Sequence, residues 1–183
     1  MWLCGDMRVR GFLLGGTYGR TTLNGEGLQH QDGHSLILAS TIPNIQTYDI
    51  AYQYELAIII QDGLKRMYKD NEDIFYFLTL GNENYEMPQM PEGVEEGVRR
   101  GLYRFSKGKK GKHKAHILGS GSIMNKAIEA QKLLEKYDVS ADIWGATNYK
   151  RLREESLEAD HWNLHHPDKP KKESYLHTTL SKE

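Results

Sequence analysis

The chain has 183 residues, of which 38% are hydrophobic and 27% are charged, and its formal net charge is −1. This composition predicts a folded chain and argues against a protein whose main task is to bind nucleic acid or an anionic membrane. The single cysteine, Cys4, excludes an intrachain disulfide framework, and no apolar run approaches the roughly 18 residues of a membrane span. We therefore expect one domain or two small ones, in the cytoplasm.

The first half of the chain predicts strands on either side of a helix. We expect one strand within residues 8–17 and a second over the apolar run 35–42. Asp49 is a suitable cap for a helix over residues 51–68. The aromatic run 74–80 is typical of a strand that is covered on both faces. A strand, a helix and a strand in this order indicate a parallel sheet.

The second half repeats this alternation. We expect helices at residues 92–100, from Ser122 onward and at 149–162, and strands at 101–105, 115–119 and 142–147. The tail after these elements is polar and rich in lysine. Five lysines between residues 107 and 114 could bind phosphate, but no aromatic side chains are interleaved with them. A solvated connecting loop is the better interpretation, and this loop or the prolines before it mark the domain boundary.

Two patterns invite ligand-binding interpretations. Gly119-Ser120-Gly121 lies between a predicted strand and a predicted helix, as in the dinucleotide fingerprint, but Met124 occupies the place of the third glycine. A tight turn that opens a helix is the simpler interpretation. His161 and His165 are four residues apart on a predicted helix, which raises the question of a metal site. No third ligand is evident, so we interpret both as surface or cap residues.

The most distinctive stretch is the polar, glycine-rich segment from Asn24 to Ser35, which hydrophobic segments bracket on both sides. That pattern is typical of a functional loop between rigid elements. His30 is its candidate catalytic residue, because imidazole can donate, accept or carry charge near neutral pH. His30 and His34 are also four residues apart, but Gly33 argues against the helix that would bring them together on a metal ion. The polar segment 81–85, which follows a predicted strand, is a second candidate region.

Several motifs give the chain a family resemblance. GDMRVRGFLLGGT at residues 5–17 and GEGLQHQDGHS at residues 25–35 resemble the homodimeric bacterial pyruvate dehydrogenase component, a thiamine diphosphate enzyme. The resemblance continues through TIPN (41–44), YELA (54–57), DGLKRMY (62–68), NENY (82–85), MPEG (90–93) and LGSGSI (118–123). It covers almost the whole chain and fades after about Asp168. The long motif around His30 is the most specific part.

The resemblance implies an α/β chain of the transketolase-like, thiamin diphosphate-binding fold. Residues 1–90 would be the later part of the pyrimidine-binding domain, and residues 91–183 the first part of the C-terminal α/β domain. The implied activity is oxidative decarboxylation of pyruvate with acetyl transfer to the lipoyl groups of dihydrolipoyl acetyltransferase. The implied cofactors are thiamine diphosphate and Mg²⁺, and the implied assembly is a homodimer. The organic chemistry in such enzymes is the cofactor's, while the protein orients it and supplies protons and charge.

The resemblance implies a catalytic role for His30 near the substrate-derived part of the intermediate. It implies loop support from four other motif residues, Glu26, Gln29, Asp32 and His34. The family's magnesium-binding motif and cofactor-activating glutamate have no counterpart here, so we expect a fragment that is inactive alone and that has no metal site of its own. The alternatives are another transketolase-like 2-oxo acid dehydrogenase, transketolase itself, or a domain that only binds a partner.

Overall fold

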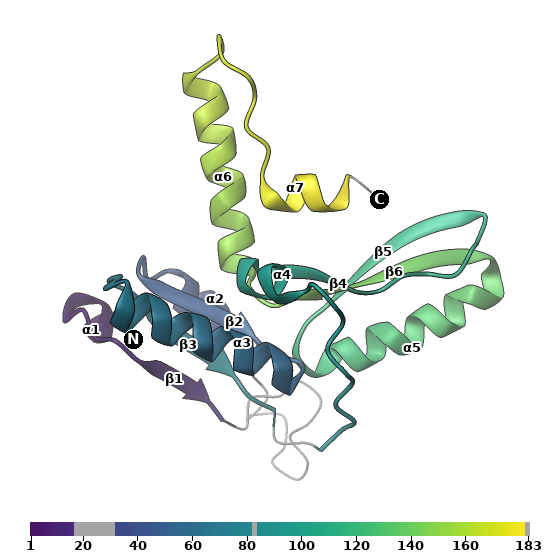
Figure 1. Cartoon of the computed structure of the whole chain (residues 1–183), viewed down its shortest axis with the longest axis horizontal. Helices are drawn as coiled ribbons and strands as arrows, with labels where there is room; N and C mark the ends of the chain where they lie inside the picture. Colours follow the sequence, from purple (N-terminus) through teal and green to yellow (C-terminus); the bar gives the residue numbers. More distant parts are fainter. Residues whose placement is uncertain (17–31, 82–83, 182–183) are drawn as a thin grey trace.

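The computed structural model describes residues 1–16, 32–81 and 84–181 (Figure 1). Its helices are α1 (Trp2–Asp6), α2 (Ser35–Ser40), α3 (Gln53–Leu64), α4 (Glu95–Arg100), α5 (Met124–Leu134), α6 (Tyr149–His165) and α7 (Tyr175–Leu180). Its strands are β1 (Phe12–Gly15), β2 (Ile45–Asp49), β3 (Phe75–Thr79), β4 (Leu102–Ser106), β5 (His113–Gly119) and β6 (Val139–Ala146). A π-helical turn, η2 (Lys65–Lys69), extends α3, and 3₁₀ turns η3 (Gly121–Ile123) and η4 (Glu135–Tyr137) flank α5.

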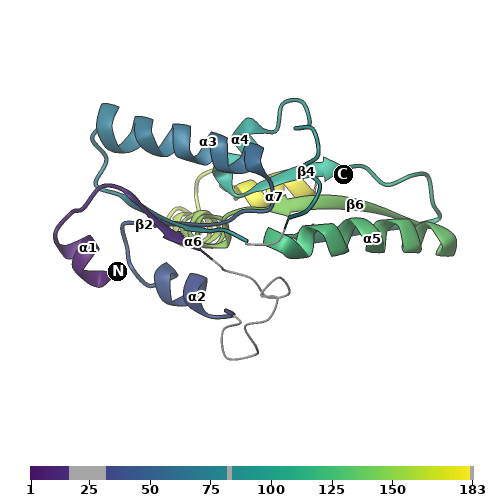
Figure 2. The ribbon, with the colours of Figure 1, turned by 90° about the horizontal axis from the view of Figure 1, so that it is seen from below.

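The first sheet is entirely parallel and has the strand order β1-β3-β2. Every residue of β3 is buried, which confirms the strand predicted from the aromatic run. Helix α3 lies on one face of this sheet, and α1 and α2 lie on the other (Figure 2). Such coverage is what parallel strands with apolar side chains on both faces require. We call this sheet and its helices the N-terminal unit.

The strand predicted at residues 35–42 is wrong, because residues Ser35–Ser40 form α2. The periodicity of a short apolar run fits a buried strand and a helix equally well. In the structure only Ala39 and Leu36 of α2 pack into the core cluster beside the first sheet. The strand that precedes α3 is instead β2, so the prediction of a parallel sheet is confirmed with a different strand. Asp49 is the last residue of β2 and not a helix cap.

The second sheet is mixed, with the order β4-β6-β5. Strand β5 pairs with β6 in parallel, with α5 as the connection between them, which confirms the second strand-helix-strand prediction. Strand β4 pairs with β6 in antiparallel orientation, and the lysine-rich segment connects β4 to β5 as a loop. Ser122 lies inside the turn η3 and Ile123 precedes α5, so the cap predicted at Ser122 is wrong. This sheet, with the helices after Gly101, is the C-terminal unit.

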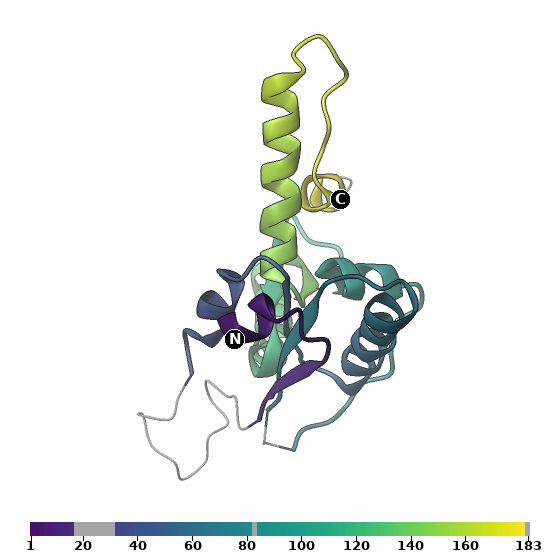
Figure 3. The ribbon, with the colours of Figure 1, turned by 90° about the vertical axis from the view of Figure 1, so that its left-hand side faces the viewer.

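Helix α6 projects from the body of the molecule, and α7 lies beside it (Figures 1 and 3). Helix α7 was not predicted, because the tail around it is polar. Its apolar residues Tyr175, Leu176 and Leu180 pack against a cluster that contains Leu102 and Trp144. The largest core cluster draws residues from both units, so the two sheets share one core. Among the described residues, no helix is long and apolar enough to cross a membrane.

Candidate functional site

The predicted catalytic loop is only partly within the described residues. Glu26, Gln29 and His30 fall in the range 17–31, which lies outside them. Asp32 and His34 are described and lie at the C-terminal end of the loop. One carboxylate oxygen of Asp32, Oδ1, accepts hydrogen bonds from the backbone N–H groups of His34 (2.9 Å) and Ser35 (3.0 Å). This Asp32 carboxylate therefore fixes the turn that leads from the loop into α2.

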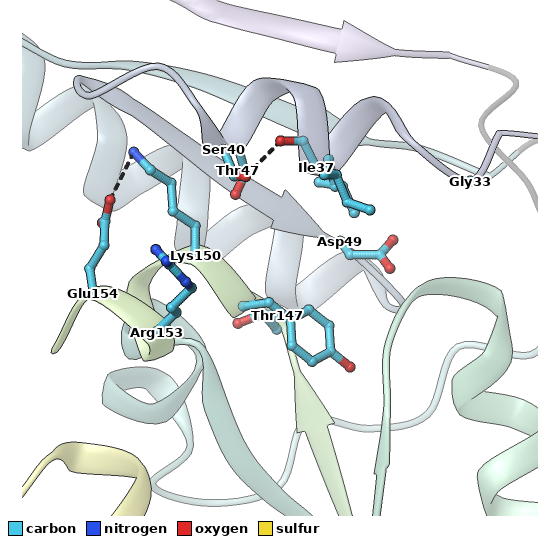
Figure 4. Close-up of a pocket in the computed structure, with 11 residues that line it drawn as sticks. Gly33, Ile37, Ser40, Thr47, Asp49, Thr147, Lys150, Arg153 and Glu154 are labelled. Carbon is cyan, nitrogen blue, oxygen red and sulfur yellow. Dashed lines mark hydrogen bonds and ion pairs between the residues drawn. The ribbon is translucent and has the colours of Figure 1, made fainter. Parts of the chain in front are cut away.

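A pocket of about 310 Å³ opens where this loop meets α2, at the junction between the two units (Figure 4). The N-terminal unit lines it with Gly33, Leu36, Ile37, Ser40, Thr47 and Asp49, and the C-terminal unit with Thr147, Tyr149, Lys150, Arg153 and Glu154. The pocket lies beyond the carboxyl ends of β2 and β6. Ligands of open α/β sheets bind in that position. The charges of the two carboxylates and the two basic groups in the lining balance, so the lining has no formal net charge.

Asp49 forms the floor of this pocket and connects three segments. The hydroxyl of Thr79, at the end of β3, donates a hydrogen bond of 2.7 Å to its carboxylate. The backbone N–H of Asp49 donates to the carbonyl of Thr147, which follows β6, at 2.9 Å. Gly121 has a φ of +50°, and a β-carbon at this position would lie 2.7 Å from the Asp49 carboxylate. The second glycine of Gly119-Ser120-Gly121 therefore serves a close approach between the units, and the turn opens a helix as predicted.

Lys150 closes the wall of the pocket between the two units. Its ammonium group donates hydrogen bonds to the backbone carbonyls of Ile42 (2.9 Å), Pro43 (3.1 Å) and Ile45 (2.9 Å). Its side chain is 5% exposed, and the carboxylate of Glu154 lies 3.3 Å from the ammonium. The three N–H donors of the lysine are thus used on the stretch that runs from the end of α2 to the first residue of β2. The ammonium holds α6 against the N-terminal unit and has no donor left for a ligand.

Glu55 makes a second buried connection between the units. Its carboxylate accepts hydrogen bonds from the backbone N–H of Ala51 (2.6 Å) and Tyr52 (3.1 Å), which satisfies free donors at the start of α3. The hydroxyl of Tyr103, on β4, donates to the same carboxylate at 2.6 Å, and the hydroxyl of Tyr54 lies 2.6 Å from that of Tyr103. Burial raises the pKa of the Glu55 carboxyl, and these hydrogen bonds oppose the rise.

The second predicted region, residues 81–85, is also only partly described. Asn82 and Glu83 lie outside the described residues. The hydroxyl of Tyr85 donates a hydrogen bond to the carbonyl of Ala51, which ties this segment to the start of α3. Within the described ranges, no group of three His, Cys, Asp or Glu side chains is placed to hold a metal ion. The lysine-rich loop is anchored by an ion pair of 2.9 Å between Lys109 and Glu135, and by a hydrogen bond of 2.6 Å from the backbone N–H of Gly108 to the carboxylate of Asp142.

Sequence reasoning did not find Lys150, Glu55 or Asp49 as residues of this junction. The partners of Lys150 are backbone carbonyls more than 100 residues away, which no local pattern reveals. Glu55 carries a local signal, because a glutamate in the first turn of a helix often accepts from the N–H groups that begin it. The sequence suggests Asp49 as a cap for α3, but the contacts of Asp49 are with Thr79 and Thr147.

Comparisons with known proteins agree with the two units. The family model for the pyruvate dehydrogenase E1 component middle domain matches residues 1–88, and that for the transketolase-like C-terminal domain matches residues 101–183. The chain is 50% identical, over 181 residues, to the pyruvate dehydrogenase E1 component of Pseudomonas aeruginosa, with 98% of this chain and 20% of that protein covered. Its identity to the Escherichia coli K12 component is 51% over 168 residues, which covers 91% of this chain and 19% of that protein.

Solved structures place the fold in the same group. Transketolase from Campylobacter jejuni superposes with a TM-score of 0.66 at 20% identity, over 83% of this chain and 22% of that chain. A transketolase mutant from Pichia stipitis gives a TM-score of 0.62 at 20% identity, over 80% of this chain and 20% of that chain. The fold is therefore transketolase-like α/β. The chain belongs to the family of bacterial pyruvate dehydrogenase E1 components, and it spans about a fifth of the length of those relatives.

Proposed function

We propose that this chain is a working segment of a thiamine diphosphate-dependent pyruvate dehydrogenase that decarboxylates pyruvate and transfers the acetyl group to a lipoyl group. The observation that carries the proposal is the identity of about 50% to E1 components along nearly the whole chain. The chain spans about a fifth of those relatives, so the activity would belong to a longer protein. The proposed partners are a second copy of that protein and dihydrolipoyl acetyltransferase, and the proposed location is the cytoplasm.

The proposed domain division assigns residues 1–90 to a pyrimidine-binding domain and residues 91–183 to the start of a C-terminal domain. Two separate sheets, one parallel and one mixed, support this division. The junction contacts of Lys150 and Glu55 would then lie between domains. Such contacts are suited to hold one domain in a fixed orientation on the other.

The cofactor assignment rests on the relatives and not on the described residues. Thiamine diphosphate supplies the carbanion chemistry of such enzymes when it is bound. Among the described residues no group of three His, Cys, Asp or Glu side chains is placed to hold an ion, and the lysine of the pocket already donates to three carbonyls instead of being open to a diphosphate. The described residues therefore do not fit the magnesium-diphosphate part of the cofactor, and we assign no cofactor contact to them.

His30 is the proposed catalytic residue of the segment. The proposed role is to hold or move a proton at its imidazole, close to the substrate, while Glu26, Gln29, Asp32 and His34 support the loop. The turn that Asp32 fixes at the entrance to α2 supports this division of roles, because it anchors the end of the loop on a packed helix. A proton donor placed in this way typically contributes about 10²- to 10⁴-fold to a rate.

A segment exchange tests the proposed activity. The matching fifth of the Pseudomonas aeruginosa E1 component is replaced with this chain, and pyruvate-dependent acetylation of an isolated lipoyl domain is followed by mass spectrometry. We expect the chimera to acetylate the lipoyl domain, since the exchanged segments are 50% identical. A folded dimeric chimera without acetylation would contradict the proposal. Turnover of sugar phosphates in place of pyruvate would favour transketolase, the function of the proteins that share the fold.

A further inference from the structure

The outer part of α6 carries a pair of histidines that neither the core nor the junction uses. His161 and His165 lie one helical turn apart, and the centroids of their rings are 4.4 Å apart. Both side chains are exposed, and neither imidazole has a hydrogen-bond or ion-pair partner among the described residues. The sequence alone suggested surface or cap positions. The two rings also lie close together on one face of a projecting helix, so that both can contact the same ligand.

The neighbouring third histidine is engaged elsewhere. The ring of His166 stacks on Trp162 with 3.6 Å between centroids, and its Nδ1 lies 2.9 Å from the carbonyl of the same tryptophan. Lys172, the one cation lining the same hollow, holds its ammonium 3.6 Å from the centre of the Trp162 ring. His161 and His165 are therefore the two imidazoles in this hollow that are open to a ligand.

Two imidazoles at this spacing match the needs of a transition-metal ion. Histidines at positions i and i+4 of a helix lie on the same face, which is how helical zinc sites present two ligands to one ion. Neutral imidazole binds Zn²⁺, Ni²⁺ and Cu²⁺, with zinc-nitrogen distances of about 2.0–2.1 Å. Glu158, one turn before His161, lines the same hollow and adds a negative charge near a bound cation.

We propose that His161 and His165 form a two-imidazole binding site for a divalent transition-metal ion on the outer part of α6. Water completes the coordination, because the described residues hold no group of three potential ligands. This site is separate from the pocket beside α2, and it does not depend on the proposed catalytic activity. A bound ion would link two successive turns of α6 and stabilise the projecting end of the helix.

The test is a calorimetric titration of the full, tag-free chain with Ni²⁺ and with Zn²⁺ near neutral pH. Each ion is titrated into the unchanged chain, His161→Ala, His165→Ala and the double variant, with His113→Ala as the matched control at an exposed histidine of β5. Alanine favours helix, so the α6 variants should keep their fold, which far-UV circular dichroism verifies. We expect the unchanged chain to bind one ion. Each single variant should bind the ion at least about tenfold more weakly, because one coordinate bond is lost. The affinity of the His113→Ala control should not change.

A second readout distinguishes this site from binding elsewhere in the chain. Electron paramagnetic resonance of the Cu²⁺-loaded chain should show two nitrogen ligands, and this pattern should be lost in the double variant. Binding that persists in the double variant would overturn the proposal. So would half an ion per chain, which would mean an ion shared between two molecules, or no binding at millimolar concentrations of metal.

Discussion

The junction between the two units buries charged side chains, whereas the outer surface of the N-terminal unit exposes apolar ones. At the junction, the charged groups of Lys150 and Glu55 are buried, and each of them makes hydrogen bonds to the opposite unit. On the outer surface, Trp2, Leu3 and Leu14 are exposed by 56%, 67% and 57%. Polar contacts therefore help to fix how the two units are oriented on each other, whereas the outer surface of the N-terminal unit keeps apolar side chains accessible.

The largest effect is expected from Lys150→Met, which removes the buried ammonium. Three backbone carbonyls would lose their donor, and burying unsatisfied polar groups costs about 3 kcal/mol or more in total. Urea denaturation of the full chain should show this loss in the free energy of unfolding. The matched control is Lys126→Met, an exposed lysine that pairs with Glu129 on α5, which should change stability by less than about 0.5 kcal/mol. Equal stability of the two variants would mean that the junction does not depend on Lys150.

A smaller loss is expected from Glu55→Gln, since a glutamine amide keeps the size of the side chain. It cannot accept all the donors that the carboxylate accepts from Ala51, Tyr52 and Tyr103, and we expect a cost of about 2 kcal/mol. Tyr103→Phe removes only one of these donors and should cost less. A larger loss in Tyr103→Phe than in Glu55→Gln would contradict this order.

Glu55 also predicts a pH dependence with a defined sign. Burial raises the pKa of its carboxyl in the folded chain above the value in the unfolded chain. Between these two values the folded state holds more protons, so the contribution of Glu55 to stability falls as the pH rises through this window. The stability advantage of the unchanged chain over Glu55→Gln should therefore shrink as the pH rises above the ordinary pKa of a glutamate, about 4.3. A growing advantage over this range would contradict the account.

Gly121→Ala should destabilise the junction by about 1–2 kcal/mol. The new methyl group would meet the Asp49 carboxylate, and the backbone there has a φ of +50° that favours glycine. Gly16→Ala is the matched control, because a β-carbon at that glycine has no neighbour within 4 Å. Thermal unfolding followed by circular dichroism compares the two variants. A melting temperature lowered equally by both would show that close approach at Gly121 is not the cause.

The smallest effect is expected at the tip of α6, where Leu164→Ser replaces a side chain that is 76% exposed. Little apolar surface is buried there, so the free energy of unfolding should change by less than about 0.5 kcal/mol. Chemical denaturation at several protein concentrations provides the measurement. A larger, concentration-dependent loss would reveal that Leu164 is covered in an assembly of chains.

The sequence predicted the elements whose patterns are strong and local. The buried run of β3, the parallel sheet and the helices α5 and α6 are confirmed. The run that became α2 was mistaken for a strand, because six apolar or small residues in sequence carry no decisive periodicity. Helix α7 was missed because its stability comes from tertiary contacts with Leu102 and Trp144, which the local composition does not reveal.

The candidate site could be predicted from the sequence less fully than the fold. The motif around His30 pointed to a loop, and the description of Asp32 and His34 shows where this loop enters α2. The pocket beside it could not be predicted, since its lining joins residues from Gly33 to Glu154 through contacts between two units. The roles of the motif residues stay predictions.

The most direct test of the account is the role of His30 in catalysis. In the Pseudomonas aeruginosa chimera that carries this segment, His30→Ala is compared with His34→Ala by single-turnover decarboxylation of pyruvate, with the fold checked by circular dichroism. A proton-handling role for His30 predicts a rate at least about 10²-fold lower in His30→Ala, and a smaller loss in His34→Ala, which only supports the loop. A rate in His30→Ala equal to that of the unchanged chimera would contradict the account and reduce His30 to a loop residue.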